Sequence, residues 1–128
     1  MPEKEIVRTE RAPAPFQGAP YNQAVKAAGL VFVASQLGLR PGEKAPVAGI
    51  TAQTEQVMQN LGAILEEAGS GLDRLVKTTV FLQDLGDFAA MNEVYAAHVG
   101  DAPPARSTVE VAKLPSGALV EIEAVGLL

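Results

Sequence analysis

The chain has 128 residues, of which 48% are hydrophobic and 20% charged, a composition typical of one soluble globular domain over residues 1–128. Fifteen acidic against ten basic residues give a formal net charge of −5, which argues against nucleic acid or an anionic membrane as the main partner. The chain has no cysteine and one histidine, His98. A disulfide framework, thiolate catalysis and a multi-histidine metal site in one chain are therefore excluded.

Residues 1–5 lack an apolar signal core, and no apolar run approaches the ~20 residues needed to cross a bilayer, so we expect a cytoplasmic protein.

The N-terminal part is expected to form three short strands. The first lies near residues 6–7, before a proline-rich loop over residues 12–20 in which proline fixes φ and removes amide donors. Ala24–Lys26 and Leu30–Ser35 are rich in strand-forming residues and flank a turn at Ala28-Gly29. These segments predict a strand, a long loop and then two strands joined by a turn.

From about Gly49 to Ala68 the apolar residues recur at helical spacing. Gly69-Ser70-Gly71 is expected to end this helix, because glycine accepts the left-handed conformation of a C-terminal cap. The apolar positions are Ile50, Val57, Leu61, Ile64, Leu65 and Ala68, and the polar residues expected mostly on the other side are Gln53, Gln56, Gln59 and Glu66.

The segment Leu75–Leu82 is β-branched and almost continuously apolar, which predicts a central strand. Asp84 or Asp87 is then expected to cap a second helix that runs to about Val99.

Two final strands, Ser107–Lys113 and Ala118–Val125, surround Leu114-Pro115-Ser116-Gly117, whose turn residues predict a hairpin. Two helices among six strands predict an α+β fold, a two-layer domain with a six-stranded mixed sheet and both helices on one face. The other face would carry Val, Leu and Thr without a cover, so we expect self-association to bury it.

Arg106 is the most unusual residue for its position. It enters a strand directly after Ala102-Pro103-Pro104-Ala105, with no acid nearer in sequence than Glu110. On a strand it shares one face with Thr108 and Glu110. Its planar guanidinium matches a carboxylate in two parallel hydrogen bonds. Arg106 is therefore either an anchor for a small carboxylate ligand or a surface or structurally paired arginine.

Glu121 and Glu123 project from one face of the last strand, whose other face is apolar. They form either a solvated face or a site where one carboxylate positions a water. Taken alone, Tyr21 is interpreted as an anchor of the rigid loop. Asn92 is interpreted in the same way as a surface residue of the second helix. His98, near the end of that helix, suits the negative end of the helix dipole and is given no catalytic role.

Taken together, several segments resemble the Rid (reactive intermediate deaminase, YjgF-like) family, and they cover nearly the whole chain in order. The most specific are Pro104-Ala105-Arg106-Ser107 and the later Glu121-Ile122-Glu123. The other matching segments are Gly18–Val25, Gln53–Gln56 with Asn60-Leu61, Val76–Leu82, Asp87-Phe88, Met91–Tyr95, Thr108–Val111 and Leu114-Pro115.

The resemblance implies a chorismate-mutase-like fold, a homotrimer with ligand clefts between subunits, and no metal or organic cofactor. It also implies hydrolysis of 2-imino acids, such as 2-iminobutanoate and 2-iminopropanoate, to 2-oxo acids and ammonia. Its catalytic residues would be Arg106, which binds the substrate carboxylate, and Glu121, which orients the water. The family's cleft tyrosine and asparagine fall on Tyr21 and Asn92.

Two departures from the family concern the cleft. Many members read Ser-Gly-Gln where this chain reads Ala34-Ser35-Gln36, and some carry cysteine where this chain has Thr108. Backbone groups near Ser35 and Thr108 are expected to orient the substrate. If the last two strands form the predicted hairpin, Glu121 lies on the order of 16 Å from Arg106 along the strands, at ~3.3 Å per residue. We therefore expect the two residues of one site to come from different subunits.

Two other functions remain open. One is a non-catalytic trimer that binds or senses 2-oxo acids with the same cleft. The other is ribonuclease or translation-inhibitor activity, against which the acidic composition and the lack of a basic aromatic patch argue.

Overall fold

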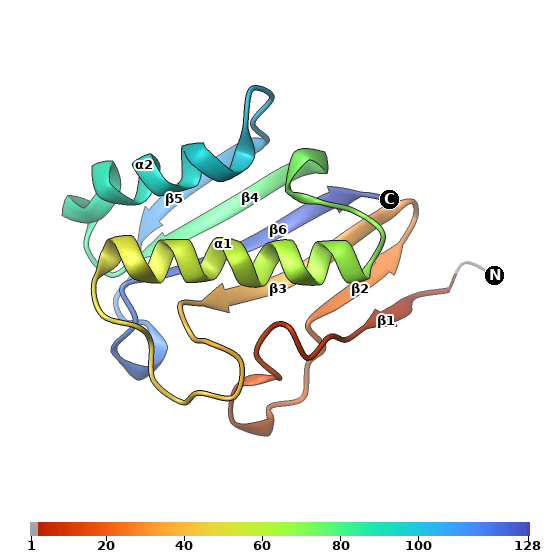
Figure 1. The fold of residues 1–128 in the computed structure, drawn as a ribbon, viewed down its shortest axis with the longest axis horizontal. Coiled ribbons are helices and arrows are strands. Elements are labelled where there is room, and N and C mark those ends of the chain that lie inside the picture. Colours follow the sequence, from red (N-terminus) through yellow and green to blue (C-terminus); the bar gives the residue numbers. More distant parts are fainter. Residues whose placement is uncertain (1–2) are drawn as a thin grey trace.

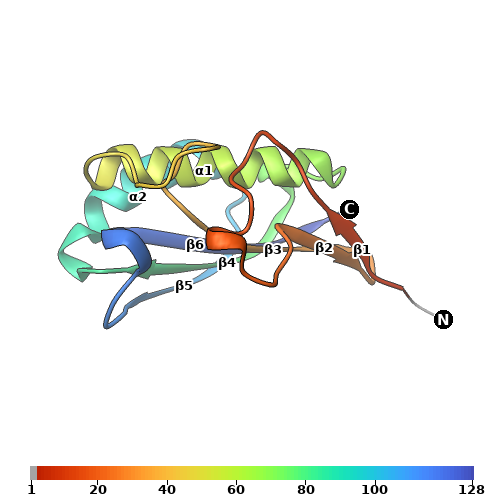
Figure 2. The same cartoon turned by 90° about the horizontal axis from the view of Figure 1, so that it is seen from below.

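The computed structural model describes residues 3–128, so Met1 and Pro2, the start of the segment examined for a signal core, lie outside the described residues. Its six strands form one sheet in the order β1-β2-β3-β6-β4-β5. Figures 1 and 2 show both helices on the same face of this sheet. The two-layer α+β architecture is thus confirmed. The strands are β1 Glu5–Val7, β2 Ala24–Ala27, β3 Leu30–Leu37, β4 Leu75–Leu82, β5 Ala105–Glu110 and β6 Val120–Leu127, and the helices are α1 Ile50–Glu67 and α2 Phe88–Val99.

The predicted hairpin between the last two strands is wrong. β5 pairs in parallel with β4, and β6 pairs antiparallel with both β3 and β4, so that β4 separates β5 from β6. Leu114–Gly117 instead contains a short 3-10 turn, Pro115–Gly117, in the crossover between the two strands. Turn residues show where a chain bends but not which strand it joins next. The apolar β6 gains two hydrogen-bonded neighbours and a buried face by entering the centre of the sheet.

α1 packs its apolar stripe against the inner face of the sheet, as its periodicity predicts. Three side chains of α2 complete this core, and Tyr95 of this helix contacts Thr78 of β4 and Arg106 of β5. The core residues of α1 include Val57, Met58, Leu61, Ile64 and Leu65, those of the sheet Val31, Val33, Val80, Leu82, Val120 and Ile122, and those of α2 Met91, Tyr95 and Val99.

The polar side of α1 is not all exposed, which corrects one expectation. Gln53 is 4% exposed, and its Oε1 accepts a hydrogen bond of 2.8 Å from the Leu119 backbone N–H. A Cβ at Gly38 would lie 2.8 Å from the Cα of Gln53, so the chain after β3 meets α1 too closely for any side chain there. Asn60 is fully buried and donates through Nδ2 to the carbonyls that flank Gly38. These contacts fix the end of β3.

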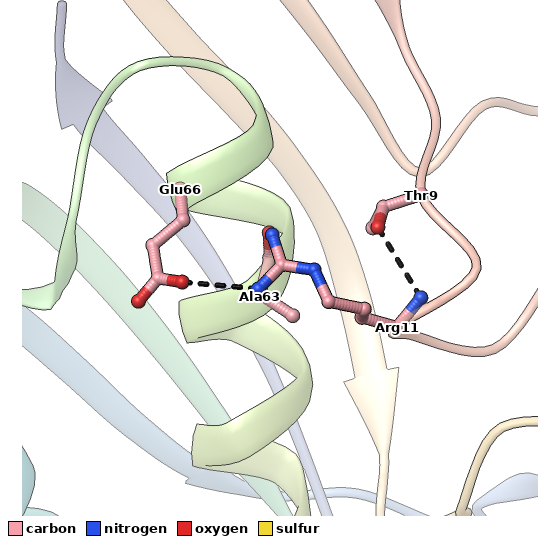
Figure 3. Close-up of polar contacts among 4 residues, drawn as sticks. All are labelled: Thr9, Arg11, Ala63 and Glu66. Atoms are coloured by element: carbon pink, nitrogen blue, oxygen red, sulfur yellow. Dashed lines mark hydrogen bonds and ion pairs between the residues drawn. The ribbon is translucent and has the colours of Figure 1, made fainter.

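The segment after β1 lies beside α1, and Arg11 reaches this helix with its side chain (Figure 3). Arg11 Nη1 lies 3.1 Å from Glu66 Oε2, its Nη2 donates to the Ala63 carbonyl, and its backbone N–H donates to Thr9 Oγ1. Both charged side chains are more than half exposed, so the ion pair itself adds little stability. Together the contacts hold the start of the proline-rich loop against the helix layer.

The face of the sheet opposite the helices carries exposed apolar side chains, as predicted from the strand pattern. Ile6, Val25, Phe32 and Val125 are cross-strand neighbours on β1, β2, β3 and β6, and Phe32 is 45% exposed. Val109 and Leu127 add further exposed apolar area. Within residues 3–128, no helix combines the length and apolarity that a membrane crossing requires.

Candidate functional site

Strand register places Arg106 on the helix face of the sheet. Its partner on β4 is Thr78, which is fully buried beneath the helices. Thr108 and Glu110 follow on the same face, opposite Val80 and Leu82. The expectation that these three residues share one face is therefore confirmed. β5 is the last strand of the sheet, so Arg106 lies at its edge, under α2.

The guanidinium of Arg106 makes no hydrogen bond and no ion pair with any of residues 3–128. The acid nearest in sequence, Glu110, is already used, since its Oε1 accepts a 2.9 Å hydrogen bond from the Leu85 backbone N–H. Two aromatic rings of α2 contact the cation instead. Arg106 Cζ lies 4.8 Å from the ring centroid of Tyr95 and 5.5 Å from that of Phe88. Arg106 is therefore not a structurally paired arginine, which was one of the alternatives that its sequence position left open.

Asn92 lies between these rings on the same stripe of α2, four residues after Phe88 and three before Tyr95. Its Oδ1 is buried and has no hydrogen-bond partner among the described residues. A buried acceptor without a partner is costly in a finished protein core. Asn92 therefore adds an unused acceptor to the α2 stripe that carries the two rings.

Glu121 lies on the opposite, open face of the sheet, next to Phe81 of β4 and Leu37 of β3. A register shift between Val33 and Gln36 interrupts the β3–β6 ladder. Ser35, inside this shift, donates from Oγ to Glu121 Oε1 at 2.6 Å. The side chain of Ser35 is therefore directed to the Glu121 carboxylate, whereas the sequence predicts a role for backbone groups near Ser35.

Tyr21 is 41% exposed and its hydroxyl accepts a hydrogen bond from the Phe16 backbone N–H. The loop that carries it is fixed by buried Gln23, whose Nε2 donates to the carbonyls of Thr9, Ala12 and Pro13. The Gln23 carbonyl accepts from the Ala34 N–H at 2.9 Å, which places this loop beside the end of β3. A groove of about 870 Å³ adjoins Tyr21, but neither Arg106 nor Glu121 lines it.

One chain thus separates the candidate residues into two groups. Tyr21, Ser35 and Glu121 lie near the end of β3, whereas Arg106, Thr108 and Asn92 lie between β5 and α2. The β4 partners of Arg106 and Glu121 are three residues apart, and β4 lies between their strands. Their backbones are therefore on the order of 14 Å apart, with side chains on opposite faces. The hairpin from which we inferred a site shared by two subunits is absent. Arg106 and Glu121 of one chain are nevertheless far apart.

Sequence reasoning missed the residues that contact Arg106. Phe88 and Tyr95 are seven residues apart, which is two helical turns, and their stripe on α2 was the available signal. That signal could not show which strand α2 covers.

The sheet order and the two helices on one face define a chorismate-mutase-like α+β domain. The family model described as endoribonuclease L-PSP matches residues 9–127. A RutC family protein of Pyrococcus abyssi is 49% identical over 123 residues, with 95% of each chain covered. The Arabidopsis thaliana protein named Reactive Intermediate Deaminase A, chloroplastic, is 47% identical over 126 residues, which are 98% of this chain and 66% of that one.

Solved structures agree with these relatives. The crystal structure of RidA from the Antarctic bacterium Psychrobacter sp. matches with a TM-score of 0.91 and 43% identity, over 97% of this chain and 99% of the other. The structure of E. coli TdcF with bound serine matches with a TM-score of 0.88 and 36% identity, over 97% and 98% of the two chains. The chain belongs to the Rid family, whose model carries the endoribonuclease L-PSP description.

Proposed function

We propose that this protein hydrolyses 2-imino acids, such as 2-iminobutanoate and 2-iminopropanoate, to the 2-oxo acid and ammonia. The observation that carries the proposal is the unpaired cation of Arg106, half-buried at a sheet edge. A guanidinium without an acid partner retains its donors for a planar carboxylate. Family membership, with a relative named reactive intermediate deaminase, supplies the reaction class.

The reaction needs no covalent enzyme intermediate, because an imine carbon beside a carboxylate is already electrophilic. In the proposed mechanism Arg106 binds the carboxylate, and Asn92 and Thr108 border the substrate on the same side. Glu121 accepts a hydrogen bond from a water, which adds to the C=N bond. The resulting carbinolamine then expels ammonia and becomes the 2-oxo acid.

Within this proposal, Arg106 of one subunit meets Ser35, Glu121 and Tyr21 of a neighbour in a homotrimer. Two observations support an interface between subunits. The side chains of Arg106 and Glu121 leave opposite faces of the sheet in one chain. The open face also exposes apolar residues such as Phe32 and Val109, which self-association would bury.

A non-catalytic trimer that senses 2-oxo acids with the same cleft is the second candidate, and a bound small molecule in a related structure favours it. A structural neighbour was solved with bound serine. In a sensor the Arg106 anchor would be retained while the water-binding function of Glu121 is lost.

The test is release of 2-oxobutanoate and ammonia from imine generated by a threonine dehydratase. We expect the wild type to accelerate release and Arg106→Ala to lose more than about a hundredfold, since two charge-assisted hydrogen bonds of about 1.5 kcal/mol or more each are removed. Arg40→Ala, at an exposed arginine of the β3–α1 loop, is the matched control and should keep full activity. Binding of 2-oxobutanoate without acceleration would favour the sensor.

A ribonuclease function has the name of the family model in its favour and the net charge of −5 against it. RNA binding depends on cationic contacts to phosphate, so its affinity falls steeply with salt. A salt-dependent RNA affinity that disappears in Arg106→Ala would support this function. We expect no such affinity.

A further inference from the structure

The charge on Arg106 is held in place without being neutralised. Its Cζ lies 4.8 Å from the Tyr95 ring centroid and 5.5 Å from that of Phe88. A cation within about 6 Å of a ring centroid is attracted by the negative face of the ring. A ring offers no carboxylate oxygens, so it fixes the cation without competing for its N–H donors. An acid at the same place would bind the guanidinium edge that a carboxylate ligand needs.

The Tyr95 ring is itself fixed. Tyr95 is 5% exposed, and its hydroxyl lies 2.7 Å from Thr78 Oγ1 in a buried hydrogen bond. Thr78 is fully buried and is also the cross-strand partner of Arg106. Thr78, Tyr95 and Arg106 therefore form a closed triangle across β4, α2 and β5, in which the ring is anchored beside the strand position that it serves.

The second ring differs in kind. Phe88 is 42% exposed and lies at the first turn of α2, so the core does not need it. A second ring 5.5 Å from the same Cζ restricts the rotation of the long arginine side chain. The two rings thus limit the guanidinium to few orientations before a ligand arrives, which reduces the entropy lost on binding.

We propose that Tyr95, anchored by Thr78, is a positioning residue that holds the Arg106 guanidinium in place for the carboxylate of a 2-imino or 2-oxo acid, with the Phe88 ring as a second contact that restricts its rotation. The ligand class rests on the proposed function, whereas the positioning of the guanidinium does not. Tyr95 acts through Arg106 and needs no contact with substrate.

The first readout uses the ligand-free protein. A proton over a ring face is shifted upfield, so the Arg106 Nε–Hε resonance, assigned by its loss in Arg106→Lys, is expected upfield of exposed arginines. Tyr95→Leu should return it to the ordinary range, while Tyr95→Phe, which retains the ring, should keep most of the shift. An unshifted wild-type resonance, or one that Tyr95→Leu leaves in place, would overturn the proposal whether or not the protein is a deaminase.

The second readout is the dissociation constant of 2-oxobutanoate by calorimetry. We expect Tyr95→Leu to weaken binding about tenfold and Thr78→Val about threefold. In an Arg106→Ala background, neither substitution should weaken binding further. Val99→Ala is the matched control, because it removes a buried α2 side chain without touching Arg106. If Val99→Ala weakens binding as much as Tyr95→Leu, the effect is loosening of α2 and the proposal is wrong.

Phe88→Leu provides a test that does not risk the fold, because the ring is exposed. It should weaken 2-oxobutanoate binding about twofold to threefold with an unchanged melting temperature. Unchanged binding in this variant would remove Phe88 from the proposal. A wild type that shows the shifted resonance but neither binds 2-oxobutanoate nor hydrolyses the imine would instead reject the proposed function.

Discussion

Ser35 and Glu121 are joined by a hydrogen bond of 2.6 Å from Oγ to Oε1, between β3 and β6. The interruption in the β3–β6 ladder makes this contact available, since Ser35 lies inside the register shift. The contact orients the carboxylate and leaves Oε2 for a further partner. The contact gives Ser35 a defined role, which is to hold one oxygen of the Glu121 carboxylate.

Ser35→Ala should therefore lower kcat about tenfold or more and leave KM nearly unchanged. The substitution releases the Glu121 carboxylate but does not touch the Arg106 anchor, and one charged hydrogen bond contributes about 1.5–3 kcal/mol at most. Steady-state kinetics with dehydratase-generated imine measure both constants. A raised KM with unchanged kcat would show that Ser35 contacts the substrate instead.

Glu121→Gln should lower kcat by about a hundredfold or more, the range in which a positioned general base contributes, while 2-oxobutanoate binds as in the wild type. The amide keeps the shape of the side chain and an acceptor for Ser35 but removes the negative charge. Glu123→Gln, two residues along on the same face, is the matched control and should be fully active. Equal losses in both variants would argue for a general charge effect.

The sequence predicts the two helices better than it predicts the pairing of the strands. α1 was expected over about residues 49–68 and spans Ile50–Glu67, because one repeated period covers five turns. Of the two residues expected to cap α2, Asp87 is the N-cap but makes no side-chain capping hydrogen bond, whereas Asp84 accepts from the Gly86 N–H and caps the 3-10 turn before the helix. Helix bounds are local properties, and local pattern is enough for them.

Strand partners are not local, and the sequence could not supply them. Leu114–Gly117 has the chemistry of a tight turn, yet β6 passes β5 and pairs with β3 and β4. Alternation along the strand predicted which residues share a face with Arg106, but not that this face lies under the helices. Its contact with Tyr95 required the docking of α2 on β5, which depends on the whole core. Buried Asn60 was missed for a similar reason, since its partners are carbonyls of a distant loop.

Stability should depend on pH through a pair that joins the two helices, His98 Nε2 and Glu55 Oε2, which lie 2.7 Å apart. The hydrogen bond from His98 is the main cause that lowers the pKa of Glu55 below its usual 4.5; desolvation by burial opposes it, and the hydrogen bond from Gln59 and the charge of His98 lower the pKa further by smaller amounts. A carboxyl whose pKa is lowered on folding stabilises the fold above its unfolded-state pKa. This contribution is lost as pH falls through the lower folded-state value.

Urea unfolding of the wild type and Glu55→Gln between pH 3 and 6 measures this contribution. The wild type should be more stable near pH 6 by up to about 1 kcal/mol, because Glu55 is half exposed and its pair is screened. The two free energies of unfolding should converge towards pH 3. A difference that stays constant over the whole range would assign the effect to packing and not to the charge on Glu55.

Phe32→Glu should separate assembly from folding. Phe32 is 45% exposed and lies on the open face among the cross-strand neighbours Ile6, Val25 and Val125. A charge there would be desolvated in any interface that covers these residues but would stay hydrated in a monomer. We expect light scattering to show a trimer for the wild type at micromolar concentration and a folded monomer for the variant. The monomer should also lose imine hydrolysis, because Arg106 and Glu121 of one chain lie on opposite faces of the sheet.

Ala52→Glu, on the exposed side of α1, is the control and should remain trimeric and active. A wild-type monomer at this dilution, or an active Phe32→Glu monomer, would contradict a site shared between subunits.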